Sequence, residues 1–371
     1  MCTGIRLKAK DGTAVHARTL EFGVDIHSDI IIIPEGYERV GSTPKKSEKD
    51  RALPGKSWKS KYASVGMSAL GLDVIVDGVN EKGLAIGLFY FPGTAGYMKY
   101  NSSDASKTIG PWEVGSFLLE NYANIKEVKD IDTGICSIVV PPVILEKFNP
   151  KEAPPVHFVV SDKTGQSIVI EYVDGKVNIH DNPLGVITNS PAFDWHMTNL
   201  RNYLNFSFTN AAPMVLGSEE EGLGEVVLNQ FGQGSGMVGI PGDFTPPSRF
   251  VRAVAYSQSV SNDSPFRAET GEEAVLQAFH LLNNFDIPKG VALDRHEVEK
   301  KTAQGNSAHV VHADYTLWTS AVNLAEQKYY FRTYDNSQIR MIDLNAKKEL
   351  ALEKKIKRIS ISGKEAIQQI S

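Results

Sequence analysis

The sequence predicts an α+β fold in which helices cover two antiparallel β-sheets. Two patterns support this expectation. Segments whose side chains alternate in character are joined by short turn signals, and segments with an apolar stripe at helical spacing lie between groups of them. Strands joined by tight turns form hairpins, and hairpins build antiparallel rather than parallel sheets.

Strand hairpins are predicted along the whole chain. Residues 3–10 alternate up to the turn signal Asp11-Gly12, and residues 14–22 return as the second strand. Residues 29–34 contain four consecutive isoleucines, which indicates a buried strand. Further strands are predicted as a pair within 74–91, as three within 156–179, and at 315–322, 329–334 and 338–344.

Helices are predicted where apolar residues recur at helical spacing. The first begins at Pro111, because proline suits the first helical position, and two others span residues 193–206 and 272–285. Ser248 is expected to cap a further helix, which places Arg249 in its first turn. A cation there opposes the helix dipole, and this conflict suggests that Arg249 has a functional role.

The chain has 371 residues and contains no clear linker, so a single domain spanning residues 1–371 is expected. The opening residues do not resemble a secretory signal, which indicates a cytoplasmic protein. If Met1 replaces an export signal, the protein is instead periplasmic or secreted.

Composition and motifs exclude several function classes. A net charge of −5 gives no electrostatic reason to expect nucleic acid or an anionic membrane as a partner. No apolar run is long enough to span a membrane. The glycine-rich residues 232–236 lack the flanking strand and the lysine of a phosphate-binding loop. We therefore expect no cofactor and no bound metal.

The two cysteines, Cys2 and Cys136, differ in their expected roles. Cys136 lies in an apolar, strand-like run and is expected to be an inert core residue. Cys2 follows Met1, and aminopeptidases remove a first methionine when the next side chain is small. Removal would leave Cys2 with a free α-amino group, whose pKa of about 7.7–8.0 suits it to accept the thiol proton.

Three further residues are candidates for the same site. Arg18 and Glu21 lie on the strand that the first hairpin returns beside Cys2. A guanidinium near a thiol favours the thiolate, and a carboxylate can accept a hydrogen bond from the N-terminal ammonium or from substrate. Asn189 follows an apolar strand and can present its amide N–H to a developing oxyanion. The alternatives are a solvated ion pair for the two charged residues and a helix cap for the asparagine.

Taken together, these segments resemble the choloylglycine hydrolase family, which holds bile salt hydrolases and penicillin V acylases. The matching motifs occur in order along nearly the whole chain, at Met1-Cys2, 17–22, 77–84, 185–191, 241–246 with Arg249, and 334–337. The resemblance implies the four-layer αββα sandwich of N-terminal nucleophile hydrolases, the hydrolysis of small-molecule linear amides, and often a homotetramer.

Carried over by motif, the resemblance implies a role for each candidate residue. Cys2 is similar to the family's nucleophile and base, and Arg18 to the residue that tunes the thiol. Asn189 resembles an oxyanion or substrate contact, and Arg249 resembles the charged residue that steadies the site. Glu21 stands where the family usually has aspartate, so its carboxylate is displaced relative to the family pattern.

The residue at position 90 bears on the substrate. Penicillin V acylases have tyrosine there, as this chain does at Tyr90, whereas bile salt hydrolases typically have asparagine. Residues 287–291 and 314–316 also resemble the acylases. We therefore expect a penicillin V acylase-like enzyme that cleaves an apolar acyl group from an amine, with Tyr90 contacting the substrate.

Three alternatives stay open at this point. The first is a conjugated bile salt hydrolase that releases glycine or taurine. The second is a catalytically inactive ligand-binding homologue, which the change at Glu21 would favour. The third is an ordinary cysteine hydrolase that uses one of the nine histidines as its base.

Overall fold

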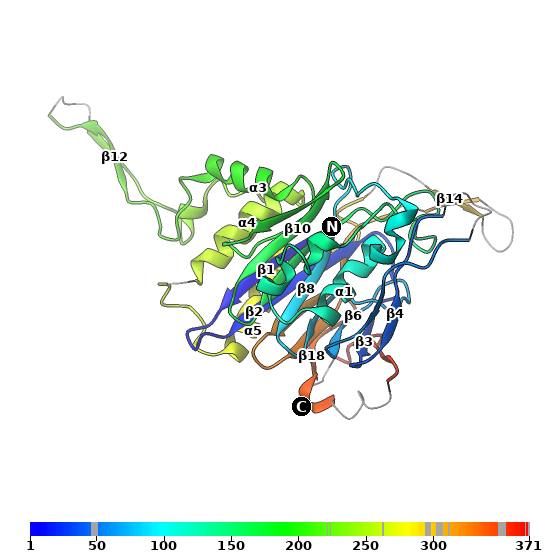
Figure 1. The fold of residues 1–371 in the computed structure, drawn as a ribbon. Helices are drawn as coiled ribbons and strands as arrows, with labels where there is room; N and C mark the ends of the chain where they lie inside the picture. The colour runs from blue at the N-terminus through cyan, green and yellow to red at the C-terminus, as the bar shows by residue number, and fades with distance from the viewer. Residues whose placement is uncertain are drawn as a thin grey trace.

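The computed structural model describes residues 1–45, 51–220, 222, 224–261, 263–293, 298–301, 307–310, 312–347, 354–367 and 369. Two antiparallel sheets form its centre (Figure 1). The five-stranded sheet has the order β1 (Cys2–Lys8), β2 (Ala14–Phe22), β16 (Tyr315–Asn323), β17 (Lys328–Thr333) and β18 (Asn336–Asp343). The predicted first hairpin is β1–β2, and the predicted C-terminal strands are β16 to β18.

The second sheet has eight strands. Their order is β11 (Lys176–Asp181), β10 (Ser167–Val173), β9 (Val156–Asp162), β8 (Leu84–Tyr90), β7 (Asp77–Asn80), β6 (Ser64–Met67), β3 (Asp29–Ile33) and β19 (Lys357–Ser360). The central strands pair with their neighbours in sequence, as hairpin turns predict, whereas β19 returns from the C-terminal part of the chain to pair with β3. That return places β19 at one edge of the sheet, beside β3.

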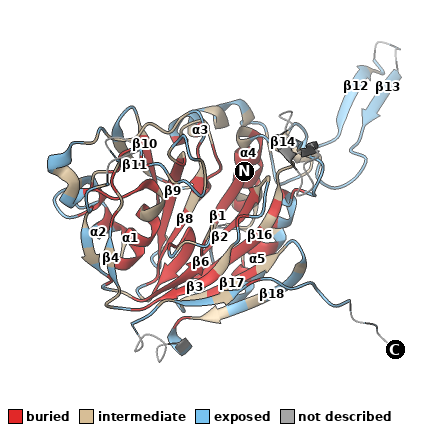
Figure 2. Ribbon diagram, turned by 90° about the vertical axis from the view of Figure 1, so that its right-hand side faces the viewer, coloured by how far each residue is buried: buried red, intermediate tan, exposed pale blue. Residues whose placement is uncertain are grey.

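Helices cover the outer face of each sheet. On the five-stranded sheet lie α4 (Pro246–Ser259) against β1 and α5 (Gly271–Leu282) against β2 and β16. On the eight-stranded sheet lie α1 (Val114–Asn121) against β7 and β8 and α2 (Ile125–Val128) against β9. Figure 2 shows the buried strands of both sheets between these two helical layers. The arrangement is the four-layer αββα sandwich.

The four isoleucines of β3 show how one strand serves two cores. Successive side chains of a strand point to opposite faces of its sheet. Ile30 and Ile32 accordingly pack in the core between the two sheets, and Ile31 and Ile33 pack in the core beneath α1. All four are almost completely buried, which explains why the run is uniformly apolar rather than alternating.

Three small sheets and several short helices lie outside the two main sheets in the described residues. Two-stranded sheets are formed by β4 (Glu38–Val40) with β5 (Ser57–Lys59), β12 (Met214–Ser218) with β13 (Gly224–Leu228), and β14 (Val298–Lys301) with β15 (Ser307–Val310). The remaining helices are α3 (Phe193–Asn199) and 3₁₀ turns at Ser102–Lys107, Pro111–Glu113, Ile135–Ser137, Leu200–Tyr203, Ser235–Met237, Asn283–Phe285 and Asn345–Lys347. None of the helices in the described ranges has the length and hydropathy that a membrane crossing needs.

Two local predictions are wrong. Cys136 is exposed on a 3₁₀ turn rather than buried in a strand, because a single helical turn carries its apolar neighbour Ile135 into the core and leaves the thiol outside. The fourth predicted helix begins at Pro246, with Thr245 as its N-cap residue, so Ser248 is not the cap. Prolines are favoured in the first turn, where no intrahelical partner is needed for the missing N–H.

We expect that Gly4→Ala destabilises the fold by about 1–3 kcal/mol through overpacking. The new Cβ would lie 2.7 Å from the ring of Phe89 and 2.8 Å from Cγ2 of Ile187. Urea denaturation measures the change, with Gly242→Ala as the control, because no heavy atom lies within 4 Å of a Cβ at that position. Equal free energies of unfolding for the two variants would contradict the described packing.

Candidate active site

A largely apolar cavity opens beside the start of the first strand. Cys2, Glu21 and Tyr90 contribute to its lining. The other lining residues are mostly aliphatic or aromatic and include Phe22, Ile26, Leu70, Leu72, Leu145 and Phe148. The cavity therefore suits an apolar group and brings it next to the only cysteine in the cavity wall.

Cys2 is held at this cavity by its backbone. It is the first residue of β1, pairs with Leu20 of β2, and is only 3% exposed. Its backbone N–H donates to Oδ1 of Asn189 at 2.9 Å, and its carbonyl oxygen accepts a hydrogen bond from Arg249. The nitrogen and the carbonyl of one residue are thus bound by the two residues that the sequence analysis expected beside it.

Arg249 is completely buried and joins these groups. Besides the carbonyl of Cys2, its guanidinium donates to Oγ1 of Thr3 at 2.8 Å, to Oδ1 of Asn189 at 2.6 Å and to the carbonyl of Phe244 at 2.9 Å. Burial lowers the pKa of Arg249. The acceptors explain how a cation is tolerated in the first turn of α4, since its charge is bound by oxygens rather than left against the helix dipole.

The amide of Asn189 has one possible orientation. Its Oδ1 accepts from the Cys2 N–H and from the Arg249 guanidinium, both of which can only donate. Its Nδ2 donates to the carbonyl oxygen of Tyr90 at 2.7 Å. An amide nitrogen carries two hydrogens, so one N–H of Asn189 anchors β8 and a second is left for another acceptor.

Arg18 lies between the two sheets. Its side chain is fully buried, and its Nη1 donates to the carbonyl of Leu88 at 2.5 Å. The guanidinium carbon lies 4.2 Å from the ring centre of Phe89 and 5.2 Å from that of Trp318. A solvated surface pair is therefore excluded for this residue, and its charge is placed two positions along the hairpin from Cys2, opposite Gly4.

Glu21 meets the chain terminus through its backbone rather than its carboxylate. The Met1 ammonium donates to the carbonyl oxygen of Glu21 at 2.6 Å and lies 3.3 Å from the carboxylate of Asp314. The carboxylate of Glu21 instead accepts from the hydroxyl of Thr316 at 3.1 Å. Burial raises the pKa of Glu21, and the nearby charge of Arg249 opposes that shift.

Tyr90 belongs to an aromatic group in the cavity wall. Its ring centre lies 6.0 Å from that of Phe22 and 6.1 Å from that of Phe148, with the Phe22 ring edge-on. Burial raises the pKa of Tyr90, so its phenol stays neutral near pH 7 and can donate a hydrogen bond. Its carbonyl accepts from Asn189 at 2.7 Å, which links the cavity wall to the Cys2 network.

Two buried histidines that the sequence analysis did not single out hold the Asn189 segment. Nε2 of His157 is 3.1 Å from the carbonyl oxygen of Thr188, and Nε2 of His196 is 2.9 Å from that of Asn189. A carbonyl only accepts, so both rings donate through Nε2. The available signal was weak: His157 is a polar residue flanked by Val156 and Phe158 in a mostly apolar part of β9. Both Nε2 atoms are committed to backbone carbonyls and are not free to act as a base for a thiol.

His157 is itself fixed by a carboxylate. Its Nδ1 is 3.0 Å from Oε1 of Glu171, and the same carboxylate accepts from the Phe193 N–H at the start of α3. Glu171 is 1% exposed, so the pair is buried. Sequentially distant strands and a helix thereby converge on the short loop that presents Asn189.

We expect stability to fall with pH below about 6.5 because of His196. Burial lowers the pKa of His196 from 6.5 to about 4. Between these values the unfolded chain binds more protons than the folded one, so the free energy of unfolding rises with pH, by about 3 kcal/mol over the window. Urea unfolding at pH 4.5 and pH 7 measures it. His196→Gln should flatten the dependence, and the exposed control His280→Gln should not; identical pH profiles for the two variants would contradict the assignment.

Comparison with known proteins agrees with this geometry. A family model described as linear amide C–N hydrolases, choloylglycine hydrolase family, matches residues 2–357. The bile salt hydrolase/transferase of Clostridium perfringens is 34% identical over 93% of this chain and 93% of its own length. The penicillin V acylase of Pectobacterium atrosepticum is 27% identical over 89% of this chain and 77% of its own length.

The fold is shared with a solved structure of this group. The crystal structure of the C2A mutant of conjugated bile acid hydrolase from Clostridium perfringens superposes with a TM-score of 0.78 and 31% identity, covering 100% of both chains. The expected sandwich of the N-terminal nucleophile type is thereby confirmed. The chain belongs to the choloylglycine hydrolase family of linear amide C–N hydrolases.

Proposed function

We propose that Cys2, freed from Met1, is the nucleophile with which this linear amide hydrolase attacks its substrate. The observation that carries the proposal is the position of Cys2, which lines the apolar cavity while its backbone nitrogen lies 2.9 Å from Oδ1 of Asn189. Removal of Met1 would turn that nitrogen into an α-amino group at the same place, where Asn189 can orient it.

The surrounding charges favour this chemistry. An α-amino group has a pKa of about 7.7–8.0 and can accept the thiol proton directly or through one water. The buried guanidinium of Arg249, bonded to the Cys2 carbonyl, disfavours a second positive charge beside it. The same positive charge, together with that of Arg18, attracts the negative charge that the sulfur of Cys2 carries during the proposed attack.

In the proposed reaction the Cys2 thiolate attacks the amide carbonyl carbon. The free N–H of Asn189 and the phenol of Tyr90 donate to the oxyanion, and the Cys2 ammonium passes its proton to the leaving amine. The C–N bond breaks and leaves an acyl thioester. A water molecule, losing its proton to the α-amino group, then releases the carboxylic acid and restores the thiol.

The proposed substrate is an amide with an aromatic or otherwise apolar acyl group, of the penicillin V type. The support is the aromatic group of Phe22, Tyr90 and Phe148 in the cavity wall, since such rings favour edge-on contact with another ring. A conjugated bile salt is the second candidate, favoured by the 34% identity to a bile salt hydrolase/transferase. Turnover of penicillin V and of glycine- and taurine-conjugated bile acids, measured side by side, separates them.

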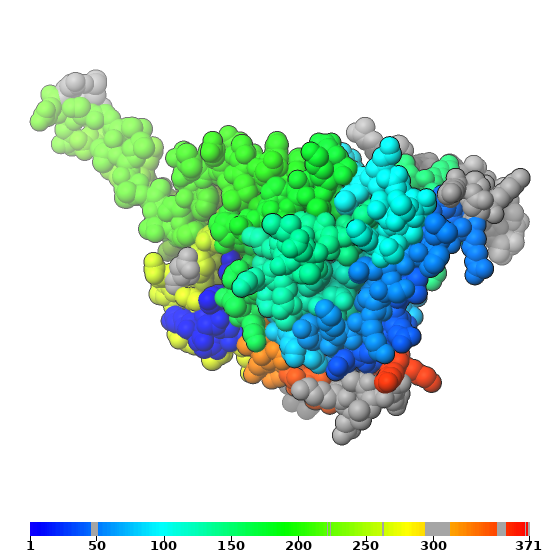
Figure 3. Space-filling view, viewed as in Figure 1, coloured from blue at the N-terminus to red at the C-terminus, as the bar shows by residue number. Residues whose placement is uncertain are grey.

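We further propose that the protein assembles as a homotetramer through the β12–β13 hairpin. Figures 1 and 3 show this hairpin projecting from the body of the molecule. Its apolar side chains are between 48% and 60% exposed, at Met214, Val215, Leu216, Val226, Val227 and Leu228. An isolated two-stranded hairpin is marginally stable in water, and an exposed apolar patch marks an interaction site.

We expect Cys2→Ala to lower amide hydrolysis by at least about 10⁴-fold, because the nucleophile is lost. Cys136→Ala is the matched control, since Cys136 is exposed on a 3₁₀ turn and does not line the cavity, and it should retain wild-type kcat and KM. Initial rates with penicillin V and a glycine-conjugated bile acid provide the measurement. Persistence of wild-type turnover in Cys2→Ala would exclude the proposed nucleophile, and a wild-type protein that binds but never turns over would indicate the inactive homologue.

We expect Val227→Glu to shift the protein to a smaller oligomer, because a charge would be buried where the hairpin packs against a partner. Light scattering coupled to size exclusion gives the mass. Glu225→Gln on the same strand is the control and should leave the mass unchanged. A wild-type protein that runs as a monomer would contradict the proposed assembly.

A further inference from the structure

The turn formed by residues 69–73 builds one wall of the apolar cavity. Ala69, Leu70 and Leu72 are lining residues. Leu70 and Gly71 have φ angles of 57° and 61°, in the left-handed region. Leucine adopts this conformation at an energetic cost, so contacts from elsewhere in the molecule must hold the turn in shape.

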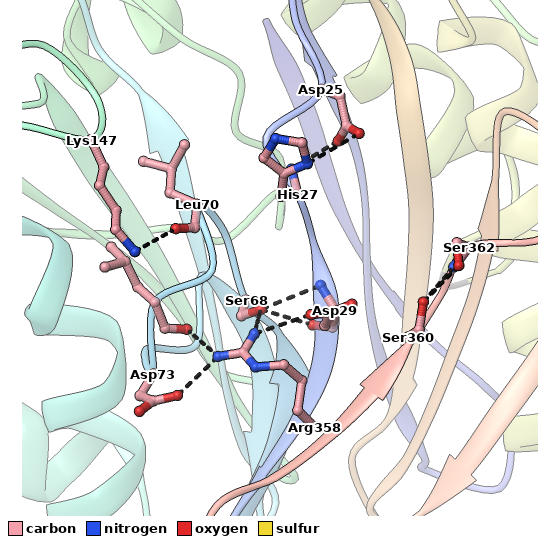
Figure 4. A network of polar contacts seen from close by, with 11 residues as sticks. Asp25, His27, Asp29, Ser68, Leu70, Asp73, Lys147, Arg358, Ser360 and Ser362 are labelled. Atoms are coloured by element: carbon pink, nitrogen blue, oxygen red, sulfur yellow. Dashed lines mark hydrogen bonds and ion pairs between the residues drawn. The ribbon is translucent and has the colours of Figure 1, made fainter.

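Arg358 of β19 supplies such contacts from almost the other end of the sequence (Figure 4). Its Nη2 donates to the carbonyl of Leu72 at 3.1 Å and to the carboxylate of Asp73 at 2.9 Å. Its Nη1 donates to Oγ of Ser68 at 3.0 Å and to the carboxylate of Asp29 at 3.2 Å. One guanidinium on the edge strand β19 therefore binds the residues on both sides of the turn and links them to Asp29 of β3.

Two other walls of the cavity are fastened to the same turn. Nζ of Lys147 donates to the carbonyl of Leu70 at 3.2 Å, and its neighbours Leu145 and Phe148 line the cavity. The N–H of Leu70 donates to the carbonyl of Ile26, another lining residue, at 2.6 Å. A shift of the turn would therefore also displace the lining residues near Lys147 and Ile26.

We propose that Arg358 is a positioning residue that sets which acyl groups the cavity accepts. The inference rests on the proposed function of the cavity as the acyl site. Arg358 contacts neither Cys2 nor the residues that bind Cys2. It acts by holding the turn in contact with the bound acyl group. Its side chain is 32% exposed, and ion pairs at such sites contribute little to the free energy of unfolding. Losing it should therefore loosen the wall without unfolding the protein.

The test compares Arg358→Met with Lys357→Met, a cation-to-methionine change one position earlier on the same strand. For penicillin V, Arg358→Met should raise KM roughly fivefold to tenfold and leave kcat within about twofold, because ground-state and transition-state binding of the acyl group fall together. For a glycine-conjugated bile acid, whose larger steroid group offers more surface for contacts away from this turn, KM should change less than about twofold. Lys357→Met should leave both substrates unaffected.

Two further variants sharpen the result. Arg358→Lys should give an intermediate KM, since an ammonium cannot bridge the same set of acceptors. Lys147→Met should act in the same direction as Arg358→Met, because it releases the other side of the turn. Thermal unfolding midpoints equal to that of the wild type would show that all variants are folded. If Arg358→Met does not fold, Arg358→Lys is used for the test in its place.

Calorimetric titration with phenoxyacetate and cholate separates this inference from the proposed function, because it needs no turnover. If the wild type binds these acids but hydrolyses neither amide, the proposed function fails. The effect of Arg358→Met on the affinity for the two acids then still tests whether Arg358 positions the turn. The inference is supported if Arg358→Met lowers the affinity for phenoxyacetate by a larger factor than it lowers the affinity for cholate, each compared with the wild type. Unchanged affinities, an equal loss for both acids, a change in kcat alone, or a wild type that binds neither acid would overturn it.

Discussion

The buried guanidinium of Arg249 is the interaction on which the rest of the site depends. It joins the carbonyl of Cys2, the hydroxyl of Thr3 and the amide oxygen of Asn189, which come from the first strand and from a loop almost two hundred residues later. A buried cation must be surrounded by acceptors, so its partners cannot move independently of it. The position of Cys2 is therefore fixed by a buried positive charge.

The sandwich explains why these partners can be brought together. β1 lies at the edge of the five-stranded sheet, directly under α4, which carries Arg249. Gly4 pairs with Ile187 across to the segment that leads into Asn189, and it can do so because it has no side chain. His157 and His196 then hold the two carbonyls of that segment from the other sheet and from α3. Both sheets and the helical layer that contains α4 thus each supply a fixed point of the site.

Much of the fold could be predicted from the sequence, because hairpin turns and apolar stripes are local signals. The first hairpin, the isoleucine strand and the three strands within 156–179 are present as expected. Cys136 was misassigned because an apolar run of a few residues does not distinguish a strand from a 3₁₀ turn. The pairing of β19 with β3 could not be predicted, since it joins segments that lie more than three hundred residues apart in the sequence.

Five of the six candidate residues lie at the cavity or bind the Cys2 backbone, whereas the contacts that hold them there could not be predicted. Cys2, Glu21 and Tyr90 line one cavity, and Asn189 and Arg249 bind the Cys2 backbone. What the sequence lacked was any signal for contacts that form only in three dimensions. The ion pair between Asp314 and the Met1 ammonium is one example, and the hydrogen bond between the buried His196 and the carbonyl of Asn189 is another.

The central claim is that the α-amino group of Cys2, formed by removal of Met1, accepts the proton of the Cys2 thiol. Mass spectrometry of the enzyme quenched during turnover of a slowly hydrolysed amide tests it most directly. The account predicts an N-terminal peptide that begins at Cys2 and carries the acyl group on sulfur. An active enzyme whose N-terminal peptide still begins with Met1, or whose acyl group is found on another residue, would contradict it.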